Sequence, residues 1–347
     1  MGMTIAQEPL FFPHAEAPPP GEVVEIARGV LWTRLALPFQ LNHINIFLIE
    51  DGDGWAVLDT GINNGATRAA WDALVAGPLK GRNLTRLIVT HFHPDHIGLA
   101  GWLCERFDMP MWTSQTSYLS SANISLQPGA LDAPTYRDFY INHGLSEGTT
   151  QLVATQGHGY LRMVAPLPPT FVRMVMGDHI MIGGRRFEVL TGDGHAPEQV
   201  MLYCAEDRLF FAADQVLAKI TPNISVWAVD PLGDPLGLYL RSLSGLRRDI
   251  PEDVLVLPGH QLPFYGLHRR AHVLAEHHHE RCAMISEAAR LQPMSAADLV
   301  PVLFHRPLDP HQMSFAFSEV LAHVNYMLGQ GQLAWSGEKG THKVVAG

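Results

Sequence analysis

Apolar and polar positions along the chain predict strands and helices in alternation. Apolar runs with many β-branched residues occur at 44–50, 55–61 and 84–90, and the turn sequence Asp-Gly-Asp-Gly separates the first two. This pattern predicts a β-hairpin followed by a buried strand. Residues 66–77 carry apolar side chains at helical spacing and end at a glycine, which predicts a helix. Strand and helix in this order are typical of an α/β domain.

A second group of strands is predicted further along the chain. Residues 179–195 and 200–216 each contain apolar runs separated by turn residues, and 253–260 predicts one more strand. A helix is predicted over 236–250. The stretch 114–176 is irregular and rich in Ser, Tyr, Met, Pro and Gly, so we interpret it as a helical insertion that lies over the active site.

The pattern changes again near the C-terminus. A long helix is predicted to begin at residue 267, and two further helices and a hairpin are predicted to follow it. Helix, helix, helix, hairpin is the element order of a winged-helix domain. The predicted organisation is therefore a flexible N-terminal arm over 1–21, an α/β domain over 22–266 with its insertion, and a winged-helix-like domain over 267–347.

Composition narrows the possible partners and the compartment. The chain has 347 residues, 47% hydrophobic and 17% charged, with a net charge of −10, which suits a folded protein and disfavours nucleic-acid or anionic-membrane binding. The first residues lack a basic and apolar export signal, and no apolar run approaches the ~18 residues of a membrane span. The cysteines, Cys104, Cys204 and Cys282, are far apart, so we expect no disulfide framework and a cytoplasmic protein.

The densest chemistry is in the segment "THFHPDH", residues 90–96, directly after a predicted buried strand. Side chains at alternate positions of a strand end can face a common centre, and imidazole with carboxylate suits a borderline metal such as zinc. This segment alone cannot complete a site for two metals. Three later strand ends each supply one more candidate ligand, which gives the set His91, His93, Asp95, His96, His195, Asp214 and His260.

This order of motifs, with an upstream "LDTG" that contains Asp59, resembles the metallo-β-lactamase superfamily over about residues 22–265. The resemblance implies a four-layer αββα sandwich. It also implies two divalent metal ions, with zinc expected and iron or manganese as alternatives. In that pattern the first metal is bound by His91, His93 and His195, the second by Asp95, His96 and His260, and Asp214 bridges them.

The resemblance further implies a hydrolase in which a metal-bridging hydroxide attacks the carbonyl of a small ester, thioester or lactone. It assigns the catalytic roles to Asp95 and Asp59, with Asp59 orienting a ligand imidazole. The proton for the leaving group is left open between Asp95, a metal-bound water and a nearby side chain, for which the candidates are Tyr140, His143 and Tyr265.

At three positions this sequence differs from particular branches of the superfamily, and these differences narrow the range of expected substrates and reactions. His93 stands where the flavodiiron branch carries Glu, and Asp214 stands where true metallo-β-lactamases usually lack Asp. Leu217 occurs where lactone-cleaving members often have Tyr. The alternatives are a phosphodiesterase or endoribonuclease, β-lactam hydrolysis as a side activity, and a non-catalytic binder. The predicted helix 312–330 contains no Lys or Arg, so we expect a small-molecule substrate rather than nucleic acid. The apolar character of the C-terminal region favours a homodimer.

Predictions can also be made for a group of apolar residues, for a run of histidines and for four arginines. Several residues of the insertion and its surroundings could line an acyl pocket, with ordinary core packing as the alternative for each: Trp112, Tyr118, Phe139, Tyr140, Tyr160, Phe171, Met174, Met176 and Trp227. The run His277–His279 is interpreted as the solvated face of a helix. Four arginines are interpreted as surface charges, with binding of a substrate carboxylate or coenzyme phosphate as the alternative: Arg185, Arg186, Arg269 and Arg270.

Overall fold

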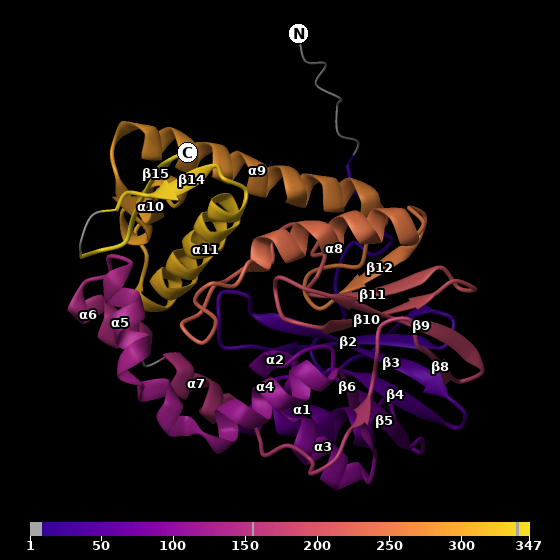
Figure 1. Cartoon of the computed structure of the whole chain (residues 1–347). Coiled ribbons are helices and arrows are strands. Elements are labelled where there is room, and N and C mark those ends of the chain that lie inside the picture. Colours follow the sequence, from indigo (N-terminus) through magenta and orange to yellow (C-terminus); the bar gives the residue numbers. More distant parts are fainter. Residues whose placement is uncertain (1–8, 155, 338–339) are drawn as a thin grey trace.

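The computed structural model describes residues 9–154, 156–337 and 340–347 (Figure 1). Of the predicted N-terminal arm, residues 1–8 lie outside the described residues. The rest of the arm is attached to the domain rather than free, because the Tyr265 backbone N–H donates to the Phe11 carbonyl over 2.8 Å. Phe12 also packs beside Phe264, with ring centroids 6.4 Å apart.

The first sheet has the strand order β1-β2-β3-β4-β5-β6-β7. Strands β1 to β4 are antiparallel, and β4 to β7 are parallel. The strands are β1 (Val24–Ala27), β2 (Val30–Ala36), β3 (His43–Asp51), β4 (Gly54–Leu58), β5 (Leu84–Ile88), β6 (Met111–Thr113) and β7 (Val172–Arg173). The predicted hairpin is confirmed: Asp51 pairs with Gly54, and Gly52 in the turn has φ +67°, a conformation that favours glycine.

The second sheet has the order β12-β11-β10-β9-β8 and is antiparallel except for the pair β11 and β12. Its strands are β8 (His179–Ile182), β9 (Arg185–Gly192), β10 (Gln199–Cys204), β11 (Leu209–Ala213) and β12 (Leu255–Pro258). The two sheets pack face to face through a buried apolar layer, in which the rings of Phe47 and Phe211 meet edge to face at 5.5 Å.

Helices cover the outer face of each sheet (Figure 1). On the first sheet lie α1 (Gly65–Ala76), α2 (Pro94–Ile97) and α3 (Ala100–Phe107), and on the second lie α8 (Pro235–Asp249) and α9 (Leu267–Leu291). Strands β4 and β11 are therefore buried along their whole length, which explains their continuous apolar sequences. The predicted four-layer αββα sandwich is confirmed.

The insertion predicted over 114–176 is mostly helical. It contains α4 (Gln115–Leu126), the 3-10 helix η1 (Pro128–Asp132), α5 (Pro134–Asn142), α6 (Glu147–Ala154) and α7 (Gln156–Met163). Helix α7 contacts α2, and α6 contacts α11 (Pro310–Gly329) of the C-terminal region. The insertion thus extends from α2, which is part of the histidine motif, to α11 in the C-terminal region, as Figure 1 shows.

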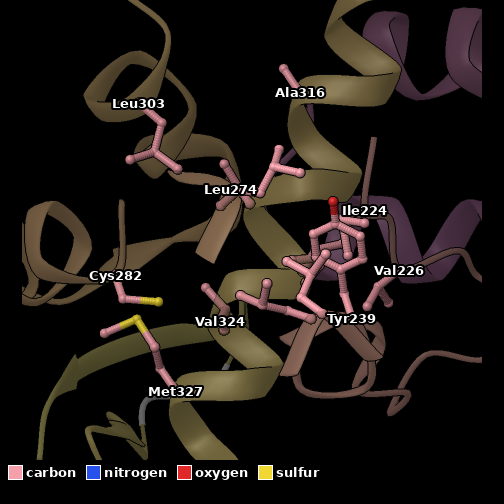
Figure 2. Close-up of a cluster of buried hydrophobic side chains, with 14 of the residues drawn as sticks. Ile224, Val226, Tyr239, Leu274, Cys282, Leu303, Ala316, Val324 and Met327 are labelled. Atoms are coloured by element: carbon pink, nitrogen blue, oxygen red, sulfur yellow. The ribbon is translucent and has the colours of Figure 1, made fainter. Parts of the chain in front are cut away.

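The C-terminal region has the predicted order of helices and an additional short strand. After α9 follow β13 (Met294–Ser295), α10 (Ala296–Leu303), α11, β14 (Leu333–Trp335) and β15 (Lys343–Ala346), with the sheet order β13-β15-β14. Helix α11 is buried along most of its length between α8, α9 and α10. Figure 2 shows side chains of this core, including Tyr239, Leu274, Cys282, Ala316, Val324 and Met327.

The interpretation of His277–His279 as a solvated face is wrong for its central residue. His279 is exposed, but His278 is fully buried against α11. Its Nδ1 lies 3.1 Å from His323 Nε2, and His323 Nδ1 donates to the Glu319 carbonyl over 2.7 Å. Since that carbonyl can only accept, His323 carries its proton on Nδ1, and its Nε2 accepts from His278. A buried imidazole pair therefore joins α9 to α11.

Arg270 is also not the surface charge that the sequence indicated. It is buried in α9, and its guanidinium donates to the carbonyl of Leu217 over 2.6 Å and to that of Ile220 over 2.7 Å. Burial lowers the pKa of Arg270. The side chain thus fixes the backbone that follows Asp214 to the first C-terminal helix. Among the described helices, none is both long and apolar enough to cross a membrane.

Replacing Arg270 by Met tests this attachment. Met retains much of the buried volume but leaves the buried Leu217 carbonyl and the partly buried Ile220 carbonyl without their donor, so we expect the free energy of unfolding to fall by about 2–4 kcal/mol. Urea denaturation followed by circular dichroism measures it. The matched variant Arg241→Met, at an exposed position of α8, is expected to change stability by less than about 0.5 kcal/mol. Equal effects of the two variants would contradict the attachment.

Candidate metal centre

The candidate ligands lie where strands of the two sheets end. His91 and His93 follow β5, His195 follows β9, Asp214 follows β11 directly, and His260 follows β12. The sequence predicted a strand end and a loop for the histidine motif. The structure differs in part, because Asp95 and His96 lie in the short helix α2. Polar residues at the ends of buried strands in an α/β layer are placed to form a site.

The structure brings the seven predicted residues together. Their potential ligand atoms form three groups, each within 4.8 Å: His91 with His93 and His195, His91 with His96 and Asp214, and Asp95 with His96 and His260. Asp214 lies close to histidines of both predicted metal sites. Its Oδ2 lies 3.5 Å from His96 Nε2, 3.5 Å from His195 Nε2 and 3.2 Å from His260 Nε2.

Hydrogen bonds on the far side of each ring orient the histidines. His195 Nδ1 donates to the Asn223 carbonyl over 2.9 Å, and His260 Nδ1 donates to the His43 carbonyl over 2.7 Å. Their Nε2 atoms therefore face the centre, where each is the atom available to bind a metal once it carries no proton. His93 is different, because its Nδ1 faces the centre, 2.9 Å from His91 Nε2.

Asp59 orients two of the histidines through one carboxylate. Its Oδ2 accepts from His96 Nδ1 over 2.8 Å, and its Oδ1 accepts from the Thr90 backbone N–H over 2.8 Å. The Thr90 hydroxyl donates to Asp59 over 2.9 Å and accepts from His91 Nδ1 over 3.0 Å. Asp59 thus reaches His96 directly and His91 through a hydroxyl. Its buried carboxylate is occupied by these donors, which makes it a positioning residue rather than a group that meets substrate.

Several polar atoms at the centre are buried without a partner. Among the described residues, these include His96 Nε2, His195 Nε2 and Asp214 Oδ1. An unpaired buried acceptor is costly, and natural structures retain such atoms mainly where an ion, water or ligand completes them. Imidazole nitrogens and carboxylate oxygens are also ligands that zinc, iron and manganese accept. The residues present therefore fit a pair of divalent cations.

Electrostatics divides the histidines into two kinds. Burial lowers the pKa of His96 and of His260, but the surrounding carboxylates outweigh it, so the pKa of His96 is well above its usual value and that of His260 is about 10. Burial raises the pKa of Asp214, yet His260 and His96 bring it well below its usual value. In the metal-free protein, two imidazolium groups therefore balance the buried carboxylates.

The other histidines of the centre are neutral. Burial, together with neighbouring imidazoles, lowers the pKa of His91 well below its usual value and that of His93 to about 3. Burial likewise lowers the pKa of His195. Neutral imidazole is the form that binds a metal ion, so these three need lose no proton for binding.

The backbone next to the candidate ligands is locally strained. Among the described residues, the non-glycine residues with positive φ include Asp59 at +63°, Ala213 at +46° and Gln261 at +69°. Ala213 precedes Asp214, and Gln261 follows His260. Such conformations cost of order 1–3 kcal/mol each and occur preferentially at functional sites.

Sequence reasoning missed several residues that support the centre. Arg34 and Asn45 both donate to the Gln261 carbonyl, Asn45 over 2.9 Å, and so fix the loop after His260. Gly259 is required for space, because a Cβ there would lie 2.3 Å from Asp214 Oδ1 and 3.0 Å from His96 Cε1. Thr90 could have been noticed beside the motif. Contacts made through the carbonyls of His43 and Asn223 leave no signal in the sequence.

Most of the predicted acyl-pocket residues lie elsewhere. Phe139 and Tyr140 belong to the core shared with α11, and Tyr118 stacks on Phe171 at 4.2 Å. Tyr160 is nearest to the motif, since its hydroxyl donates to the Phe92 carbonyl over 2.7 Å. Met174 packs between the sheets, beside the partly buried Trp112, and Met176 is exposed. Trp227 follows Asn223 by four residues and is the remaining candidate near the centre.

The alternative proton donors contact other parts of the chain. Tyr140 packs on Phe317 with centroids 6.0 Å apart, and Tyr265 packs on Phe11 at 5.9 Å. His143 donates to the Phe139 carbonyl over 2.8 Å. Asp95 is within the centre, with Oδ2 3.3 Å from His260 Nε2 and 3.6 Å from His96 Nε2.

A second group with metal-ligand chemistry lies in the C-terminal region and consists of His278, Glu319 and His323. Arg281 already binds the Glu319 carboxylate, and the two histidines bind each other. A divalent cation there would lie beside the partly buried guanidinium of Arg281. We therefore interpret this group as a structural network rather than a metal site.

Comparison with known proteins identifies the family. The model of the metallo-beta-lactamase superfamily matches residues 40–260, which is more than half of the chain. The chain belongs to the metallo-β-lactamase superfamily. The model of a metallo-beta-lactamase-like C-terminal domain also matches residues 282–345. The resemblance inferred from the motifs is confirmed, and the C-terminal region is one that occurs in this superfamily.

Individual members of the superfamily match along almost the whole chain. A beta-lactamase domain protein from Burkholderia ambifaria has a similar structure with TM-score 0.90 and 36% identity, covering 97% of this chain and 98% of that one. The metallo-beta-lactamase family protein TTHA1429 from Thermus thermophilus matches with TM-score 0.78 and 26% identity over 92% of this chain and 99% of that one. In sequence, the chain is 22% identical to the probable metallo-hydrolase YqjP of Bacillus subtilis over 89% of this chain and 95% of that protein.

Metal binding is expected to release protons. The pKa of His260 is about 10 and that of His96 is well above its usual value, so both rings carry a proton at pH 7 in the metal-free protein. Binding of two cations is therefore expected to displace about two protons. Affinity should therefore fall as the pH falls. Titration calorimetry with Zn²⁺ in two buffers of different ionisation enthalpy measures the number released. The variant His260→Gln should release about one proton fewer, and a heat independent of the buffer would contradict the charge assignment.

Gly259→Ala is expected to weaken metal binding without unfolding the protein. The new methyl group must displace the Asp214 carboxylate or the His96 ring, and shifts of this kind typically cost 10–100-fold in metal affinity. Competition with a chromophoric chelator measures the affinity, and circular dichroism checks the fold. The matched control is Gly65→Ala, where a Cβ meets open space. Unchanged Zn²⁺ affinity in Gly259→Ala would show that Asp214 is not a ligand.

Proposed function

We propose that the protein is a binuclear metal-dependent hydrolase that cleaves the carbonyl bond of a small ester, thioester or lactone, with zinc as its metal. The observation that carries the proposal is the position of Asp214, whose carboxylate lies 3.2–3.5 Å from three imidazole nitrogens contributed by different strand ends. One group of histidines is neutral and the other is protonated, and both lie beside the Asp214 carboxylate. A carboxylate in this position is suited to bridge two cations.

Each residue of the centre has a proposed role. His91, His93 and His195 would hold one cation, Asp95, His96 and His260 would hold the other, and Asp214 would be shared by both. When bound, such a pair supplies Lewis-acid activation of water and of the carbonyl group. The protein side chains fix the positions at which this occurs, because Asp59 and Thr90 orient His96 and His91, and the carbonyls of Asn223 and His43 orient the rest.

Asp95 is the proposed group for proton transfer. Its side chain is 19% exposed, against 7% for Asp214 and 5% for Asp59, so it is the carboxylate of the centre that is most open to a substrate. A carboxylate at the open side can take a proton from the attacking water and pass it to the leaving oxygen or sulfur. Asp59 is excluded from that step by its position behind His96.

A carbonyl substrate is favoured over RNA. In a winged-helix protein that binds nucleic acid, one helix enters a groove and basic side chains contact phosphate. Here α11 lies inside the core of the C-terminal region and contains no Lys or Arg. The net charge of −10 also repels a polyanion. A phosphodiester substrate is the second candidate, because the same metal pair could act on it.

A hydrolysis panel on zinc-reconstituted protein tests the proposal. It contains aryl esters, acyl-CoA and glutathione thioesters, lactones, a β-lactam, bis-p-nitrophenyl phosphate and RNA. We expect turnover of carbonyl substrates that falls at least 10³-fold in Asp214→Ala, since the shared ligand is lost. The matched control Asp53→Ala, at an exposed turn position, should retain activity. Turnover confined to phosphodiesters or RNA would overturn the carbonyl assignment.

A further inference from the structure

Four aromatic rings from three separate segments form a continuous patch. Phe39 lies in the loop between β2 and β3 and faces His311 in nearly parallel orientation, with centroids 6.3 Å apart. His311 contacts Phe315 at 4.9 Å, and Phe315 contacts Trp227 at 6.1 Å. We call Phe39, Trp227, His311 and Phe315 the aromatic patch. It joins the metal-binding domain to the first turns of α11.

The aromatic patch is accessible to solvent. Phe39 is 39% exposed and Phe315 is 37% exposed, His311 is exposed, and Trp227 is half-buried. Other large side chains of α11, such as Phe317, are fully buried. Large apolar side chains that are grouped together and left in water mark binding sites more often than isolated exposed ones.

Both ends of the patch are connected to the metal centre by short stretches of backbone. Phe39 precedes His43 by four residues, and the His43 carbonyl accepts from the candidate ligand His260. Trp227 follows Asn223 by four residues, and the Asn223 carbonyl accepts from the candidate ligand His195. Four residues span at most about 13 Å even when extended, so the patch lies within reach of a small molecule held at the centre.

The segment that precedes Trp227 is held in place by two contacts. Asn223 is bound to His195, and the Val226 backbone N–H donates to the Ser318 carbonyl of α11 over 3.1 Å. Trp227 therefore directly follows a stretch of backbone that is fixed to a candidate ligand and to α11, and its ring contacts Phe315. Rigid aromatic side chains at fixed positions provide contact area with little loss of conformational entropy when a ligand binds.

We propose that the aromatic patch binds the apolar acyl group of the substrate, with a preference for an aromatic acyl group, while its carbonyl lies at the metal centre. The inference rests on the proposed function and specifies its substrate class. It also gives the C-terminal region a direct part in substrate recognition, since His311 and Phe315 belong to α11. Stacking on ring faces favours planar groups over alkyl chains of similar size.

An ester series with a constant leaving group tests the inference. The substrates are the p-nitrophenyl esters of acetate, octanoate and phenylacetate, assayed with zinc-reconstituted protein. In Phe39→Ala and Phe315→Ala we expect kcat/KM for the phenylacetyl ester to fall about tenfold and that for the acetyl ester to change less than about twofold. Phe39→Trp should restore the preference. The matched control is Phe11→Ala, a 64% exposed phenylalanine outside the patch.

A binding measurement separates failure of the inference from failure of the proposed function. Titration calorimetry of the metal-free protein with phenylacetate, and with acetate as reference, reports on the patch without hydrolysis. Phenylacetate binding that weakens in Phe39→Ala but not in Phe11→Ala supports the site even if no ester is cleaved. If esters are cleaved but the patch variants reduce all three substrates equally, or behave like Phe11→Ala, the inference is overturned and the hydrolase proposal stands.

Discussion

The structure depends on placing three carboxylates and five imidazoles, most of them buried, at one edge of two packed sheets. Buried charges are costly unless each has a partner. Asp214 meets this constraint by lying within 3.5 Å of three imidazole nitrogens, and Asp59 meets it by accepting from Thr90 and His96. The positive φ of Asp59, Ala213 and Gln261 and the missing side chain at Gly259 follow from placing these groups so close together.

The C-terminal region is part of the support of this centre. Arg270 fixes the carbonyls of Leu217 and Ile220, three and six residues after Asp214. The Ser318 carbonyl fixes Val226, three residues after Asn223. The segment between Asp214 and Trp227 thus connects α9 and α11 to the candidate ligands. Such a region is more than an appended domain, because changes in α9 or α11 would be transmitted to the backbone that carries the ligands.

The sequence was sufficient where a feature is local or repeated along the chain. The histidine motif and the strand-end positions of His195, Asp214 and His260 follow from periodicity and spacing, and the layer order follows from the family resemblance that these motifs carry. The sequence was insufficient where chemistry depends on tertiary contact. His278 belongs to a run of three histidines that the sequence predicts to be exposed, and it is buried because α11 packs against it. Arg270 finds carbonyls fifty residues away, and the rings of Phe39 and His311 meet only in the folded chain.

Leu217 illustrates how the same centre can be adapted to different substrates. In lactone-cleaving members a Tyr is often found at this position, but here the Leu217 side chain is buried and its carbonyl accepts from Arg270. This position therefore serves packing between the α/β domain and α9 rather than contact with a substrate. Discrimination between substrates must then come from other segments at the centre. The loop with Phe39 and the start of α11 are suited to that role, because they are exposed and differ in origin from the strands that carry the ligands.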